Sequence, residues 1–229
     1  LFPIFNFYLL FNIFTKQFTF QNHQEDIHLG VMIVILTLLF YFFIIPNEEF
    51  GSVFLAITSS ISTSGIATYS SNFDVSLFFI LLTIIGGSLI STSSGFKYIR
   101  FYILLKISYQ EIYRLVKPIN IFNKNLFNTE TKLDDDDSKI AFLVFISFII
   151  AIFILSSILT LDSLNFESAF KLSILTLTNT VTSSLYGLDN LNFFDLNNFT
   201  KMSLIIFMIL GRIEIIAMLY FIMRFIFRE

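Results

Sequence analysis

The chain has 229 residues, of which 55% are hydrophobic and 14% are charged, and its formal net charge is −3. Soluble domains carry about 25% charged residues, so this composition indicates an integral membrane protein. The absence of cysteine excludes disulfides, thiolate metal sites and a cysteine nucleophile, and two histidines are too few for a histidine-rich metal centre. No basic stripe with interleaved aromatic residues is present, so we expect no nucleic-acid partner.

The hydrophobic pattern predicts four spanning helices, because such a helix needs about 20 mostly apolar residues. The opening stretch 4–14 is apolar but short, and fits either the tail of an earlier spanning helix or an interfacial segment. The second span contains a glycine- and serine-rich interruption at 86–95, and the fourth is interrupted at 211–214. In chain order the predicted spans are 29–45, 75–107, 140–161 and 202–227.

Two shorter apolar segments, 50–61 and 166–177, lie between these spans and repeat each other without gaps at an offset of 116 residues. Each precedes a run of small and hydroxyl residues. A helix of this length covers about 18 Å, roughly half of a bilayer. One copy alone would favour an amphipathic surface helix. Two copies in register favour re-entrant pore loops, whose polar backbone must be shielded by protein or water.

The placement of lysine and arginine predicts the orientation of the chain. Eight of the 14 positive residues fall within 97–139. The connection 108–139 and the C-terminus are therefore predicted to be cytoplasmic, and 46–74 and 162–201 to face outward. The acidic run 134–137 is predicted to be a solvated loop.

The stretch 62–68, Ser-Thr-Ser-Gly-Ile-Ala-Thr, suits a cation filter. A cation that crosses hydrocarbon must exchange its water for fixed oxygens, which rings of backbone carbonyls supply. Small side chains, hydroxyls and a glycine that lets carbonyls turn inward meet this need. Hydroxyl-rich turns are common, however, so this string alone is a weak signal.

Three motifs together resemble TrkH-type potassium transporters of the Trk/Ktr/HKT superfamily. The stretch 62–68 looks like the third filter of that family. The stretch 85–100, which ends in Gly-x-Lys-x-x-Arg, is similar to the glycine-rich break in the third inner helix. The stretch 210–215, Leu-Gly-Arg-Ile-Glu-Ile, resembles the signature of the fourth inner helix. The motifs follow the order of the family, and the resemblance covers about residues 10–228.

The resemblance implies an all-α membrane protein with two outer-helix/re-entrant pore-helix/inner-helix repeats of a pseudo-four-fold, cation channel-like fold. The family has four such units in one chain, and this chain resembles units three and four. The implied divisions are 1–28 (the end of the preceding unit and a cytoplasmic connection), 29–107 (the third unit), 108–139 (a cytoplasmic connection) and 140–229 (the fourth unit).

The resemblance also assigns site residues. The implied potassium filter consists of Thr63, Ser64, Gly65, Ile66, Asn179, Thr180, Val181 and Thr182. The implied gate is an intramembrane loop together with an arginine of the last span: Gly86, Gly87, Ser91, Thr92, Ser93, Ser94, Gly95 and Arg212. From the residues alone, the loop could equally be a flexible helix kink, and Arg212 could be part of an internal ion pair or bind carbonyls between helices. Lys97 and Arg100 are either gate-adjacent or ordinary membrane-end anchors.

The fourth filter departs from the pattern of the family, which usually reads Asn-Asn-x-Gly-Pro-Gly at this place. This chain has Thr-Asn-Thr-Val-Thr-Ser over 178–183, with Val181 at the expected glycine. A β-branched residue resists positive φ, so its carbonyl need not turn inward. The filter is then asymmetric, less selective, or degenerate.

The function implied is potassium, or potassium and sodium, uptake across the bacterial cytoplasmic membrane, without a cofactor in this chain. The resemblance implies a homodimer and a cytosolic nucleotide-binding regulatory subunit as partners. A non-conducting assembly subunit is the alternative that Val181 suggests. A membrane-embedded enzyme is disfavoured, because His23 and His28 precede the first span and leave a buried serine without its base.

Overall fold

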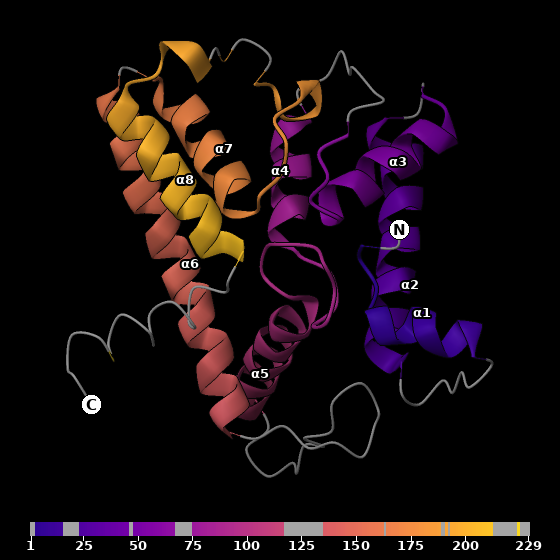
Figure 1. The fold of residues 1–229 in the computed structure, drawn as a ribbon. Coiled ribbons are helices and arrows are strands. Elements are labelled where there is room, and N and C mark those ends of the chain that lie inside the picture. The colour runs from indigo at the N-terminus through magenta and orange to yellow at the C-terminus, as the bar shows by residue number, and fades with distance from the viewer. Residues whose placement is uncertain are drawn as a thin grey trace.

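The computed structural model describes residues 3–15, 23–45, 48–66, 75–116, 135–162, 164–188, 191, 193–212 and 224. Within these residues the regular elements are helices, and one isolated β-bridge joins Ile85 to Phe96 (Figure 1). The prediction of an all-α fold is therefore confirmed for the described chain. Several predicted features, including Pro46, Ala67, Thr68, Glu214 and most of the connection 108–139, lie outside the described residues.

In the order of elements, a long helix followed directly by a short apolar helix occurs twice. In chain order they are α1 (Phe7–Phe14), α2 (Gln24–Leu39) continued by the π-helix η2 (Phe40–Ile44), α3 (Phe50–Ile61), α4 (Ser76–Ile84), α5 (Tyr98–Val116), α6 (Asp135–Leu161), α7 (Phe166–Leu177), the 3-10 turns η3 (Ser184–Tyr186) and η4 (Phe193–Asp195), and α8 (Asn198–Arg212).

Within the described part of the chain, two helices are long and apolar enough to cross a membrane, Gln24–Ile44 and Asp136–Leu161. The first helix contains the predicted span 29–45 except for Ile45, and the second contains the predicted span 140–161. Each helix begins several residues before the predicted span. The cause is electrostatic, because acidic residues in a first turn are stabilised by the positive end of the helix dipole. Glu25 and Asp26 occupy that turn in α2. The prediction of a loop at 134–137 is wrong for the three aspartates 135–137, which begin α6.

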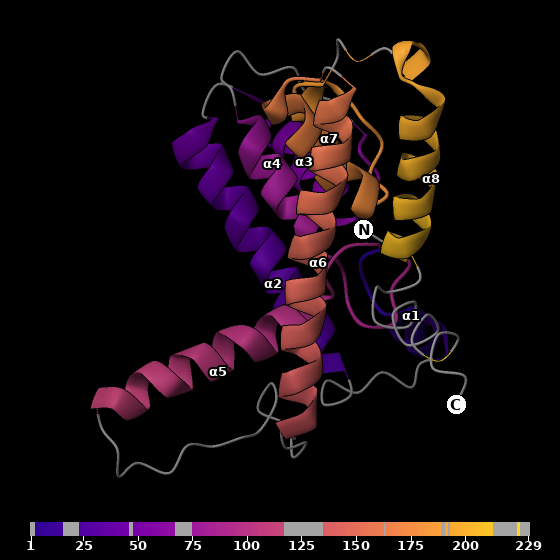
Figure 2. The same ribbon diagram turned by 90° about the vertical axis from the view of Figure 1, so that its left-hand side faces the viewer.

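Of the other two predicted spans, 75–107 is not a single helix, and 202–227 is described as a helix only over its first part. The span 75–107 consists of α4 and α5 with an irregular loop between them, as its glycine content indicated. Helix α5 then continues to Val116, into the stretch predicted as a connection, and Figure 2 shows it extending sideways from the other helices. Helix α8 covers the start of the span 202–227 and is described to Arg212.

The buried core surrounds the two short helices. In α3 every residue of 56–61 is buried, and in α7 every residue of 171–177 is buried. Helix α7 packs against α6, α8 and α4, whereas α3 packs against α2 and α4. Both short helices begin near the top of the molecule in Figure 1 and end near its middle. Their C-terminal ends are therefore held inside the bundle, where the candidate site lies.

Candidate functional site

The chain leaves both short helices through the same hydrogen bonds, so the sequence repeat is also a repeat of geometry. We refer to residues 62–66 as the α3 loop and to residues 178–182 as the α7 loop. In each loop three backbone amides fold back onto carbonyls of the last turn of the helix. The paired bonds are Ser62 to Thr58 (2.9 Å) and Thr178 to Ile174 (2.9 Å), Thr63 to Ser60 (3.0 Å) and Asn179 to Thr176 (3.1 Å), and Ser64 to Ser59 (3.0 Å) and Thr180 to Leu175 (2.9 Å).

Both loops hold a side chain in the left-handed backbone region. Thr63 has φ 56° and Asn179 has φ 51°, and among the described residues no other non-glycine residue has a positive φ. Such a conformation costs free energy and persists where neighbouring contacts hold it. The Thr63 hydroxyl accepts a hydrogen bond from the Ser94 N–H (3.2 Å), and the Asn179 side-chain amide donates to the Met208 carbonyl (2.9 Å). The α3 loop is thus tied to the segment between α4 and α5, and the α7 loop is tied to α8.

The two loops touch through their backbones. A Cβ atom placed on Gly65 would lie 2.3 Å from the Val181 carbonyl oxygen and 2.9 Å from its nitrogen. Gly65 adopts φ 70°, whereas Val181, at the equivalent position of the repeat, has no positive φ. The β-branched side chain accounts for this difference, and it is 64% exposed. The two loops therefore leave their helices through matching hydrogen bonds and differ in backbone conformation at this position.

A compact loop, residues 85–97, separates α4 from α5, and we call it the glycine loop. The two ends of this loop are joined by hydrogen bonds from the Gly86 N–H to the Phe96 carbonyl and from the Phe96 N–H to the Ile84 carbonyl, both 2.8 Å long. A Cβ atom on Gly86 would lie 2.5 Å from the Ser94 carbonyl oxygen, so a larger residue would push the two ends of the loop apart.

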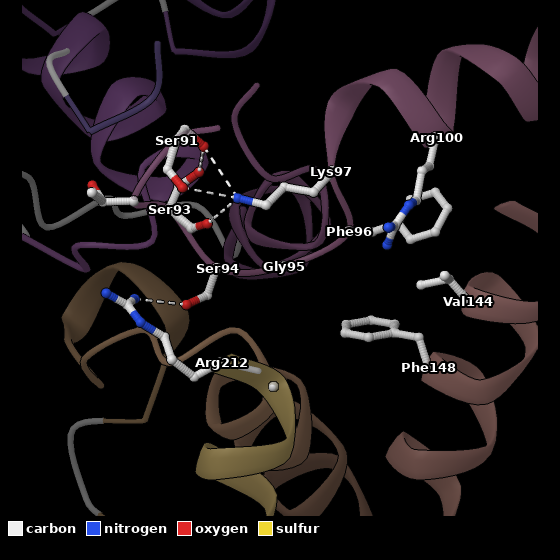
Figure 3. A pocket seen from close by; sticks show the side chains of 12 residues that line it. Ser91, Ser93, Ser94, Gly95, Phe96, Lys97, Arg100, Val144, Phe148 and Arg212 are labelled. Carbon is white, nitrogen blue, oxygen red and sulfur yellow. Dashed lines mark hydrogen bonds between the residues drawn. The ribbon is translucent and has the colours of Figure 1, made fainter. Parts of the chain in front are cut away.

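Lys97 holds the interior of the glycine loop together. Its ammonium donates to the carbonyls of Ser93 (2.8 Å) and Ser91 (3.1 Å) and to the Ser91 hydroxyl (3.3 Å), as Figure 3 shows. The Ser93 hydroxyl in turn accepts the Gly87 N–H (2.7 Å). Hydrogen bonds to the Lys97 ammonium and the Ser93 hydroxyl therefore connect the two sides of the loop.

Ser94 joins the glycine loop to both other parts of the site. Its N–H donates to Thr63, and its hydroxyl accepts a hydrogen bond from Arg212 Nη1 (3.0 Å), visible in Figure 3. Beside Arg212, a Cβ atom on Gly211 would lie 1.9 Å from the Leu177 carbonyl oxygen. The end of α8 is thus in backbone contact with the end of α7.

These contacts bring the predicted filter and gate residues into one connected region. Ile66 and Thr92 are members of these loops whose side chains are exposed. Within the described residues no cluster of three or more acidic or histidine side chains could hold a metal ion. The chemistry available is therefore that of backbone carbonyls, hydroxyls and fixed cations.

The sequence did not reveal which segments support the glycine loop from the N-terminal side. The Ile4 carbonyl accepts the Ser88 N–H (2.9 Å), and the Glu25 carboxylate accepts the Leu89 N–H (2.9 Å). The opening residues were predicted to belong to the preceding unit, and no motif links them to the loop.

A buried cation, Lys171 on α7, was also missed. Its side chain is 6% exposed, its ammonium lies 2.7 Å from the Glu167 carboxylate, and it donates to the Ser76 hydroxyl (3.2 Å). Its spacing from Glu167 by one helical turn is the signal that could have revealed the ion pair.

No family model matches the chain, and no curated protein matches it in sequence. Among solved structures it is similar to the potassium transporter TrkH from Vibrio parahaemolyticus, with a TM-score of 0.79 and 23% sequence identity. The match covers 96% of this chain and 49% of that chain, so the chain spans about half the length of the transporter it matches. This likeness confirms an all-helical fold similar to that of TrkH, and the pore-helix repeats expected from the resemblance stay a prediction.

Proposed function

We propose that this chain supplies two of the four pore-forming units of a potassium transporter in the bacterial cytoplasmic membrane. Support for a membrane setting comes from exposed apolar side chains on α2, its continuation η2, and α6, where Ile35, Phe42, Phe142 and Phe153 are more than half exposed. Exposing many large apolar side chains is unfavourable in water and suits contact with lipid.

The observation that carries the proposal is the meeting of the α3 and α7 loops. Two half-length helices end inside the bundle, release the chain through matching hydrogen bonds, and bring Gly65 and Val181 into backbone contact. The C-terminal ends of both helices carry partial negative charge, which attracts a cation to the loops. Carbonyl and hydroxyl oxygens there replace the water of the ion.

In the proposed pathway, a potassium ion enters from outside, loses water at residues 63–66 and 179–182, and then passes the glycine loop. Ser94 and Arg212 hold that loop against the α3 loop and α8, so moving the loop requires their hydrogen bond to break. In this pathway the glycine loop and Arg212 form the gate. Potassium is the transported ion that binds at the filter. We propose no enzymatic activity and no cofactor for the chain.

The partners proposed are a second copy of the full-length protein and a cytosolic nucleotide-binding regulatory subunit. Both follow from the resemblance to TrkH-type transporters. The regulatory subunit would contact the connection between α5 and α6, which the distribution of positive residues assigns to the cytoplasm.

Growth of a potassium-uptake-deficient bacterium at low potassium tests the proposal. The full-length protein should rescue growth, and Gly65→Asp should abolish rescue, because the new side chain would collide with Val181 and force a disfavoured φ. Gly51→Asp is the matched control, since Gly51 is exposed on α3 and a Cβ there meets no atom within 4 Å. Rescue by Gly65→Asp at the level of the control, with both proteins present in the membrane, contradicts the filter assignment.

A non-conducting assembly subunit is the second candidate, and the backbone of Val181 favours it. Without a positive φ at this position, one quarter of the filter presents its carbonyl differently from the α3 loop. Potassium flux into liposomes containing the purified full-length protein separates the two candidates. Flux above that of protein-free liposomes supports the transporter, and its absence supports the assembly subunit.

A further inference from the structure

Helix α5 extends sideways from the other helices and carries a row of exposed apolar side chains (Figure 2). Leu105, Tyr109, Ile112 and Val116 follow one another at intervals of four, three and four residues, so they lie on one face of the helix. Their exposed fractions range from 56% at Leu105 to 72% at Val116. We call these four residues the α5 stripe.

The α5 stripe lies on the side of the helix that faces α2. Tyr102 precedes Leu105 by three residues and shares its face, and the centre of its ring lies 6.3 Å from that of His28 on α2. On another face of α5, Ile103 packs with Ala141 of α6. The stripe therefore points to the side of α2, one of the two described helices that are long and apolar enough to cross a membrane.

The contact with α6 sets the level of α5 relative to the membrane. Ala141 lies four residues after Asp137, near the start of the segment Asp136–Leu161 that could cross a membrane. The side chains of Asp136 and Lys139, just before it, are 84% and 76% exposed. Helix α5 thus meets α6 where charged residues give way to apolar ones, which is the level at which water meets hydrocarbon.

The composition of α5 suits this level. It has 19 residues, but it contains Arg100, Lys106, Glu111 and Arg114 and is not among the described helices that are apolar enough to span. It also contains four of the nine tyrosines of the chain. Tyrosine is enriched where a membrane meets water, because its ring is apolar and its hydroxyl is polar. A helix with one apolar and one charged face lies in that plane, with the apolar face inserted about 5–10 Å.

Lipid fits the α5 stripe better than a second copy of the chain does. A stable protein–protein interface uses about 20–30 residues on each side, whereas the stripe offers four along one helix. Ile140 and Leu143, which flank Ala141 on α6, are 47% and 51% exposed. The helix that α5 contacts therefore also exposes apolar side chains at this level.

We infer that α5 is an interfacial helix, which lies in the cytoplasmic leaflet of the bilayer with the α5 stripe inserted among the lipid chains next to their headgroups. The glycine loop ends where α5 begins, so this helix would attach the end of the loop to the membrane surface. The inference rests on the membrane setting proposed above but not on potassium transport.

Spin labels on single cysteines test this inference in the purified full-length protein, otherwise free of cysteine and reconstituted in vesicles of phosphatidylcholine and phosphatidylglycerol. Each label reports its accessibility to oxygen, which partitions into lipid, and to a nickel chelate, which stays in water. Labels at Tyr109→Cys and Ile112→Cys should show an oxygen-to-nickel accessibility ratio severalfold higher than a label at Glu111→Cys. Glu111 is the matched control, because it is adjacent to Ile112 on a different face of α5 and the two are similarly exposed, at 61% and 64%.

A label at Phe153→Cys on α6, which is 56% exposed within the segment that could cross a membrane, provides the reference for lipid contact. A lipid-like ratio at 153 together with equal, water-like ratios at 111 and 112 overturns the inference and leaves the membrane setting intact. Low accessibility of 109 and 112 to both reagents also overturns it, because protein, such as a second copy, then covers the stripe. A water-like ratio at 153 contradicts the membrane setting and the inference with it. The assay needs no ion flux, so a protein that fails to conduct can still confirm the inference.

Discussion

At the scale of single residues, two glycines set how closely the backbones of the site approach one another. Gly211 lies in α8 with a helical backbone, so its constraint is purely steric: a Cβ atom would lie 1.9 Å from the Leu177 carbonyl oxygen. Gly65 is constrained twice, by its contact with Val181 and by φ 70°. The first glycine fixes α8 against α7, and the second fixes the α3 loop against the α7 loop.

Gly211→Ala should therefore destabilise the protein. The added methyl group cannot be accommodated unless the helix ends separate, and overpacking of this kind costs about 1–3 kcal/mol. Gly51→Ala is the control, because it lies in α3, meets no atom within 4 Å, and gains up to about 1 kcal/mol of helix propensity. Thermal unfolding in detergent should move the two variants in opposite directions. A Gly211→Ala protein as stable as the control would show that the ends of α7 and α8 are not held in contact.

At the scale of elements, the same repeat yields two loops of unequal conformation. The hydrogen bonds at 62–64 and 178–180 match, because both helices end in hydroxyl residues that tolerate the same tight exit. The loops differ one residue later, where glycine in one copy and valine in the other have different allowed φ ranges.

Val181→Gly should make the α7 loop resemble the α3 loop and, under the proposed function, improve discrimination of potassium from sodium. Removing the β-branch allows a positive φ and lets the carbonyl at 181 take the orientation of that at 65. We expect the potassium-to-sodium permeability ratio in proteoliposomes to rise by up to roughly tenfold, equivalent to about 1.4 kcal/mol of differential binding. Val181→Ala, which lacks the β-branch but still disfavours positive φ, should change it much less. An unchanged ratio in Val181→Gly would count against a role for this carbonyl.

Asp162 joins two elements at the opposite end of the bundle from the start of α6. Its carboxylate accepts hydrogen bonds from the Thr200 hydroxyl and the Asn197 N–H, and these bonds lower the pKa of Asp162 below its ordinary value of 3.8. A lowered pKa in the folded state means that the ionised group stabilises the fold above pH ~4 and that this contribution disappears as the pH falls through the folded-state pKa.

Asp162→Asn should accordingly lower the unfolding temperature at pH 7, and its difference from the wild-type protein should shrink as the pH is lowered below ~4. Asp136→Asn serves for comparison, because Asp136 is exposed and pairs with Lys139 within one helix. Its effect should be small at every pH. A constant difference between Asp162→Asn and wild type from pH 7 to pH 3 would exclude the carboxylate hydrogen bonds as the cause.

The elements that could be predicted are those whose signal is local in the sequence. The bounds of α3 and α7 followed from an ungapped repeat of apolar and hydroxyl residues, and the break between α4 and α5 followed from clustered glycine and serine. The support of the glycine loop by Ile4 and Glu25 depends on contacts between distant residues and left no pattern. The helical start of α6 was missed because an acidic run fits a solvated loop and a helix N-terminus equally well.

At the scale of the whole molecule, the arrangement of helices makes a prediction about sidedness. The segment of α6 that could cross a membrane, Asp136–Leu161, has 26 residues. At about 1.5 Å per residue, its length exceeds the roughly 30 Å thickness of a hydrocarbon core. Its start near Asp137 and the start of α8 near Asn198 should then lie on opposite sides of the bilayer. The excess of lysine and arginine between α4 and α6 predicts that the start of α6 lies on the cytoplasmic side.

Because this chain has no cysteine, single cysteines can report these positions without background from its own residues. Asp137 and Asn198 are both exposed, so Asp137→Cys and Asn198→Cys should fold normally in a full-length protein otherwise free of cysteine. A membrane-impermeant thiol reagent should label Asn198→Cys in intact spheroplasts and Asp137→Cys only after the membrane is permeabilised. This expectation follows from the predicted outward orientation of 162–201. In inverted vesicles, whose cytoplasmic side faces the reagent, Asp137→Cys should be labelled and Asn198→Cys should be protected. If both positions react from the same side, α6 does not span the bilayer, and the two loops cannot lie on a path across it.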